Sequence, residues 1–146
     1  MAYTTINDPE AYFQVKAYTG TASSTSFTLD GDTDMQPDLV WLKVRSAGSG
    51  QDHTIFDSVR GVQKYLEPNE NNAEQTGTAF LTAFNSDGFT LGNDQTHVNA
   101  SGDTYVAWCW KESATAGFDI VSYTGNATAR TISHSLSAVP KFMLVK

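Results

Sequence analysis

The clearest pattern in the chain is an alternation of apolar and other residues over short stretches. It is strongest in Leu39–Arg45 and Thr104–Lys111, where even-numbered and odd-numbered residues fall on opposite faces. In the second stretch, Trp108 and Trp110 fall on the face opposite Cys109. A period of two residues is typical of β-strands, so both stretches are predicted to be strands.

Weaker alternation predicts five further strands, at Tyr12–Tyr18, Ser26–Leu29, His53–Asp57, Ala79–Phe84 and Phe89–Leu91. Turn residues such as those of Ser86–Gly88 separate them. Val59, Val62 and Leu66 have helical spacing and predict one short helix over Ser58–Leu66. The expected fold is therefore all-β, an antiparallel β-sandwich or jelly roll with at most one short helix.

The chain also repeats part of itself. The motif FQVKAYTG, which begins at Phe13, returns as FDIVSYTG at Phe118, and PDLVWLK from Pro37 returns as PKFMLVK from Pro140. We therefore divide the chain into an extended N-terminal arm (1–11), a β-sandwich domain (12–112), a linker (113–117) and a final segment (118–146). That segment is interpreted as the partial start of a second copy in a longer protein, or as strands that complete this or a neighbouring sheet.

Composition narrows the class of protein. The 146 residues are about one domain's worth of chain, with 17% charged residues against the usual 25% or so. The net charge of −7 argues against nucleic-acid binding, and no apolar run approaches the roughly 20 residues of a membrane span. The start of the sequence does not have the pattern of a signal peptide. Cys109 is the single cysteine, and its position favours a buried small apolar residue over a reactive thiol.

Three aspartates are the weak candidate for a metal site. Asp30, Asp32 and Asp34 have the spacing of the first ligands of a calcium loop, but Met35 and Trp41 stand where that loop needs Gly and Glu. An Asp-rich turn is the preferred interpretation, and no cofactor is expected. The sequence contains no G-x-S-x-G motif and no zinc-ligand spacing, so no enzymatic activity is predicted.

The candidate ligand or partner contacts are Trp41, Trp108, Trp110 and Arg60. Because the tryptophans lie inside strong strands, core packing is the favoured interpretation, and a platform that stacks on sugar rings is the alternative. For Arg60 the favoured role is an ion pair with Asp57 that fixes a turn, and a ligand contact is the alternative.

Several strings resemble a β-rich domain family in virion proteins of tailed phages, particularly marine ones. They are MAYTTINDPEAYFQVKAYTG, MQPDLVWLKVRS, HTIFDSVRGVQKYL, AFNSDGFTLG and YVAWCWK. The resemblance covers residues 1–112 almost continuously, and 118–146 resembles the start of the family's next copy. It implies a shape similar to concanavalin-like jelly rolls, in long fibre-like or appendage proteins. It supplies no catalytic or ligand residues.

The resemblance implies a structural protein of the phage particle, assembled in the host cytoplasm. Because the sequence opens with Met1, we expect the N-terminal, particle-attachment domain of a tail fibre or appendage involved in host adsorption. The expected partners are other virion proteins of the tail, adaptor or head, and further copies of the chain, as a trimer. A lectin-like module that recognises host surface glycans is the alternative function. A polysaccharide depolymerase is the third hypothesis, but no carboxylate-lined groove is indicated.

Overall fold

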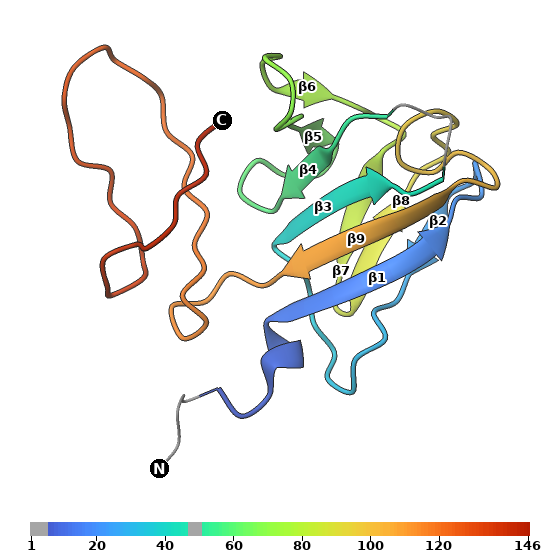
Figure 1. Cartoon of the computed structure of the whole chain (residues 1–146), viewed down its shortest axis with the longest axis horizontal. Coiled ribbons are helices and arrows are strands. Elements are labelled where there is room, and N and C mark those ends of the chain that lie inside the picture. The colour runs from blue at the N-terminus through green and yellow to red at the C-terminus, as the bar shows by residue number, and fades with distance from the viewer. Residues whose placement is uncertain (1–5, 47–50) are drawn as a thin grey trace.

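The computed structural model describes residues 6–46 and 51–146. It is an antiparallel β-sandwich in which a three-stranded sheet lies behind a four-stranded sheet (Figure 1). The four-stranded sheet has the order β1-β9-β3-β4, the three-stranded sheet has the order β2-β8-β7, and β5 pairs with β6. The strands are β1 (Phe13–Thr19), β2 (Thr25–Phe27), β3 (Leu39–Val44), β4 (Thr54–Asp57), β5 (Lys64–Tyr65), β6 (Gln75–Thr76), β7 (Leu81–Asn85), β8 (Gly88–Leu91) and β9 (Thr104–Trp110).

The prediction of an all-β antiparallel sandwich is confirmed. Each of the seven predicted strands overlaps an observed one, whereas β5 and β6 were not predicted. The predicted turn at Ser86–Gly88 connects β7 to β8, and Gly88 adopts a φ of 110°, which glycine tolerates far better than other residues. In the described ranges, no helix has the length and apolarity that a membrane crossing requires.

The predicted helix over Ser58–Leu66 is wrong. The segment forms turns in which Gly61 and Gln63 have φ values of 88° and 68°, and these left-handed values interrupt any α-helix. Its last residues are instead extended, because Lys64–Tyr65 pairs with β6 and Leu66 pairs with Ile55 through two backbone hydrogen bonds. The helical spacing of the apolar residues was therefore misleading.

The core lies between the two larger sheets. Along β9, buried and half-buried residues alternate, and Tyr105, Ala107 and Cys109 point into the core. The ring of Tyr105 stacks on that of Tyr18 with centroids 5.0 Å apart. The other members of the buried cluster are Leu29, Met35, Val40, Leu42, Phe56, Tyr65, Phe80, Leu81, Phe89, Leu91 and Val98.

Asp94 organises the loop that leads from β8 into β9. Its carboxylate accepts hydrogen bonds from the backbone N–H groups of Thr96, His97, Val98 and Asn99, at 3.2, 2.7, 2.6 and 3.3 Å. Although burial alone would raise the pKa of Asp94, these four backbone hydrogen bonds lower it below its usual value. The Asp94 carboxylate thus helps to fix the loop that brings β9 to its place between β1 and β3, together with the Asn99 side chain, which bonds to Ser23 and Gly92.

The N-terminal arm was expected to be extended over residues 1–11. Residues 1–5 lie outside the described part, and Pro9–Ala11 forms a turn of 3-10 helix, η1. This turn contacts the neighbouring Asp-rich loop, where the Glu10 carboxylate accepts a 2.8 Å hydrogen bond from the Asp32 N–H group. The described residues of the arm are therefore attached to the sandwich.

Residues 118–146, called the tail below, contain no strand, and none of them is buried. The tail runs as a long loop beside the sandwich, coloured orange to red in Figure 1. At its base, Ser113 and Phe118 form an isolated bridge with hydrogen bonds of 2.9 and 3.1 Å, so the predicted linker 113–117 is a closed turn. Whether the tail begins a second copy or completes another sheet stays a prediction.

Candidate functional site

The most distinctive surface is the outer side of the four-stranded sheet. The residue register aligns Trp108 of β9 with Trp41 of β3 on one side and with Val15 of β1 on the other. One step along, Trp110 lies beside Phe13. We call these five residues the aromatic face. It contains every tryptophan of the sequence.

Ring contacts hold this face together. The rings of Trp41 and Trp108 meet edge to face with centroids 6.3 Å apart, and Phe13 packs on Trp110 at 5.0 Å. Such tilted contacts are favourable because the positive edge of one ring meets the negative face of another. The aromatic face is therefore pre-organised, not a set of independent mobile side chains.

A pocket of about 240 Å³ opens on the aromatic face, lined by Trp41, His53, Trp108 and Trp110. The indole N–H group of Trp41 donates a 2.9 Å hydrogen bond to Nδ1 of His53. Burial lowers the pKa of His53 below its usual value, and the nearby Lys43 ammonium group adds to this effect. A neutral ring is required here, because only an unprotonated Nδ1 can accept the indole hydrogen.

Core packing was the favoured interpretation of the tryptophans, and it is wrong. All three are half-buried and lie on the outer side of the sheet, while Cys109, between two of them in sequence, is fully buried. Phe13 and Val15 beside them are 40% and 46% exposed. A contiguous apolar surface of this kind commonly marks a site of interaction.

The tail contributes one ring to this surface. Phe118 stacks on Trp110 with centroids 6.2 Å apart and an angle of 27° between the rings. Close to this contact, the carboxyl group of Glu112 donates a hydrogen bond to Asp119. This bond raises the pKa of Glu112 to about 7 and lowers that of Asp119. The carboxyl pair thus links the end of the sandwich domain to the first residues of the tail.

The aspartates predicted as a weak metal site do not converge. Asp30, Asp32 and Asp34 are all exposed, and Asp30 forms an ion pair with Lys16. Within residues 6–46 and 51–146, no three His, Cys, Asp or Glu side chains are grouped so that they could hold a metal ion. These aspartates belong to a surface loop that also binds the η1 turn.

Arg60 has the structural role that the sequence favoured. Its Nε donates a 2.6 Å hydrogen bond to the Asp57 carboxylate, and its backbone N–H group donates to the same side chain at 2.8 Å. The guanidinium group also reaches the carbonyl oxygen of Ile55 at 3.2 Å. Arg60 does not line the tryptophan pocket, so the structure separates it from the other three candidate residues.

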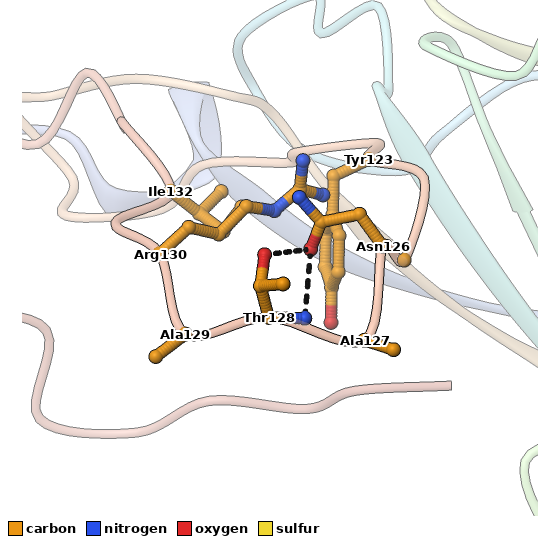
Figure 2. A pocket seen from close by; sticks show the side chains of 8 residues that line it. Tyr123, Asn126, Ala127, Thr128, Ala129, Arg130 and Ile132 are labelled. Atoms are coloured by element: carbon orange, nitrogen blue, oxygen red, sulfur yellow. Dashed lines mark hydrogen bonds between the residues drawn. The ribbon is translucent and has the colours of Figure 1, made fainter.

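A second hollow, of about 360 Å³, lies inside the tail and is shown in Figure 2. The guanidinium carbon of Arg130 lies 5.4 Å from the ring centre of Tyr123, a cation–π contact across the loop. Between them, the Asn126 side chain accepts hydrogen bonds from the N–H and hydroxyl groups of Thr128. These contacts shape the loop locally.

Four residues of this surface were not among the candidates from the sequence: Phe13, Val15, His53 and Phe118. His53 is one of three histidines that lie far apart in the sequence, without the spacing of metal ligands. Its single usable signal was its place at the edge of a predicted strand that could pair with the strand of Trp41. Phe118 was assigned to the repeat and not to the tryptophans.

A comparison with protein-family models identifies the family of this chain. A family model described as a domain of unknown function, DUF7483, matches residues 8–146. The chain belongs to the DUF7483 family. The match includes both the sandwich and the tail of this DUF7483 domain. No curated protein sequence and no solved structure matches the chain.

Proposed function

We propose that this DUF7483 domain is a structural component of a tailed-phage particle, the attachment domain of a tail fibre or appendage that takes part in host adsorption. The phage context rests on the resemblance of the strings in residues 1–112 to phage virion proteins. The observation that favours a structural role is the aromatic face, an apolar surface pre-organised for contact with another macromolecule. Tryptophan and other aromatic residues are enriched at protein–protein interfaces.

In this proposal the domain contributes a binding surface and no chemical step. The buried cluster of the sandwich fixes β3 and β9, and their alternation presents Trp41, Trp108 and Trp110 outward. Other virion proteins of the tail, adaptor or head, and further copies of the chain, are the proposed partners. Assembly would take place in the host cytoplasm.

Purified phage particles that encode this chain provide the test. We expect mass spectrometry to detect the chain in washed particles, and antibodies raised against it to label the tail or its appendages in electron micrographs. Expression in infected cells without incorporation into particles would overturn the proposal.

The second candidate is a lectin-like role in binding host glycans, which the tryptophan pocket favours. Indole rings flank a pocket of about 240 Å³, and aromatic rings of this kind pack against the C–H faces of sugars. Titration with host surface oligosaccharides should then shift tryptophan emission, and Trp41→Ala should abolish the shift while Arg60→Ala should not. No shift with any host glycan would exclude this role.

A further inference from the structure

The last residues of the tail form an unusually exposed apolar run. Its five large apolar side chains are 54–83% exposed, and they are Val139, Phe142, Met143, Leu144 and Val145. Soluble proteins rarely leave such a contiguous surface uncovered, and those that do commonly use it to bind a partner. We call residues 139–145 the apolar run.

The apolar run has the sequence pattern of a strand. In the internal repeat, Phe142 and Leu144 align with Leu39 and Trp41 of β3, which lie on the outer side of the sheet. Met143 aligns with Val40, which points into the core. An extended conformation would therefore present Phe142 and Leu144 together on one side.

The aromatic face already accepts a ring from a tail. Phe118 of the same chain stacks on Trp110, and the tail then forms a long loop beside the sandwich (Figure 1). Its last residue returns to the sandwich at a different place, where the Lys146 ammonium group donates a hydrogen bond to the carbonyl oxygen of Glu70. The pocket between Trp41 and Trp108 stays open beside this contact. The face thus already packs against one apolar ring from a tail and leaves room for further apolar side chains.

Charge also favours contact between a tail and a sandwich. Residues 1–117 carry fifteen acidic and six basic side chains, a net charge of −9. The tail carries three basic side chains, Arg130, Lys141 and Lys146, and one acidic side chain, a net charge of +2. The opposite charges of the tail and the sandwich promote their encounter, whereas the negative charge shared by two sandwiches disfavours contact between them.

We propose that the apolar run of one copy docks on the aromatic face of a second copy, with Phe142 and Leu144 directed into the pocket between Trp41 and Trp108. Donor and acceptor surfaces are different parts of the chain, so the contact is head-to-tail. Repetition of such a contact gives a closed ring or a filament. This proposal concerns the chain itself and does not depend on its place in a phage particle.

The tryptophans make the contact directly measurable, because all three lie on the aromatic face and none lies elsewhere in the sequence. A peptide of residues 138–146 is titrated into the full chain while tryptophan emission is recorded. We expect a saturable blue shift as the face becomes covered. The same peptide with Phe142→Ser and Leu144→Ser should give no shift.

Light scattering then tests association of the full chain over a range of concentrations. The wild type should exceed its monomer mass of 15.9 kDa as concentration rises. The double variant Phe142→Ser/Leu144→Ser should remain at the monomer mass with an unchanged circular dichroism spectrum. The matched control Val59→Ser/Val62→Ser alters two other apolar residues, 47% and 40% exposed, and should associate like the wild type.

Two results would overturn the proposal. If the wild type stays monomeric at every concentration while Phe142→Ser/Leu144→Ser changes its tryptophan emission, the tail covers the face of its own chain. If association survives the double substitution and the peptide does not shift the emission, another surface forms the contact.

Discussion

Replacing Asp94 by alanine tests the loop that places β9 in the sheet. The Asp94 side chain is only 6% exposed and accepts hydrogen bonds from four successive backbone N–H groups. Alanine has no acceptor, so these donors lose their partner. Two of the bonds, to the N–H groups of Val98 and Asn99, are buried, and water cannot easily replace the carboxylate there.

The size of the effect follows from those two buried donors. An unsatisfied buried donor costs about 1–3 kcal/mol, so Asp94→Ala should reduce the free energy of unfolding by about 4 kcal/mol. The effect should also depend on pH. Because the pKa of folded Asp94 lies below its usual value, its contribution is fully present above about pH 4 and is lost as pH falls through the folded pKa.

Urea denaturation at pH 7, followed by circular dichroism, measures this change. Asp32→Ala is the control, because Asp32 is an exposed aspartate in a surface loop, and it should change the free energy of unfolding by less than about 0.5 kcal/mol. The difference between wild type and Asp94→Ala should shrink in acid. A loss below about 1 kcal/mol for Asp94→Ala, or a loss independent of pH, would refute the role given to this carboxylate.

Three further predictions concern the titratable groups His53, Glu112 and Cys109. The pKa of His53 is lowered in the folded protein, so His53 should become protonated only below pH 6.5. Protonation breaks its hydrogen bond with the Trp41 indole and should change Trp41 emission, and an equal change in His53→Phe would contradict this. Raising pH through about 7 should ionise Glu112, break its bond to Asp119 and lower the protection of the linker amides, measured as their exchange rate relative to unstructured peptide at the same pH. Glu112→Gln should remove this change in protection. Burial raises the pKa of Cys109 to about 12, so a thiol reagent at pH 8 should label it only after unfolding; rapid labelling of folded protein would contradict this.

The strands were predictable because alternation is a local property of the chain. β3 and β9 show a period of two residues, and the structure separates their residues onto two faces as expected. Which face would be buried could not be read from β9 alone. One face carries Trp108 and Trp110 and the other Tyr105 and Cys109, so both are apolar.

Packing against the second sheet decides which face of β9 is buried, and that sheet is assembled from residues distant in the sequence.

The burial of Gln14 shows the same limit, since an amide on a strand is usually expected to face solvent. Its side chain is only 7% exposed because it bonds to the backbone of Glu10, Gly31 and Thr33, the last two on a loop that sequence reasoning could not bring near it. The missed pairing of Leu66 with Ile55 has the same long-range origin.

The tail shows a different limit. Because the tail repeats the motifs of β1 and β3, strands were predicted there. In the sandwich, however, β1 and β3 do not pair with each other, because β9 lies between them. The tail repeats the two strands that flank β9 and has no counterpart of β9 itself. A repeated sequence motif therefore does not fold alike when its neighbour in the sheet is missing.

Hydroxyl-radical footprinting of the aromatic face, in the isolated chain and in intact phage particles, tests most directly whether this face is an assembly surface. In the isolated chain, at a concentration where it is monomeric, we expect oxidation of Trp41, Trp108 and Trp110, while the fully buried Tyr105 stays protected. In particles the three tryptophans should become protected to a similar degree. Equal oxidation of the tryptophans in both states would contradict the proposed role of the aromatic face.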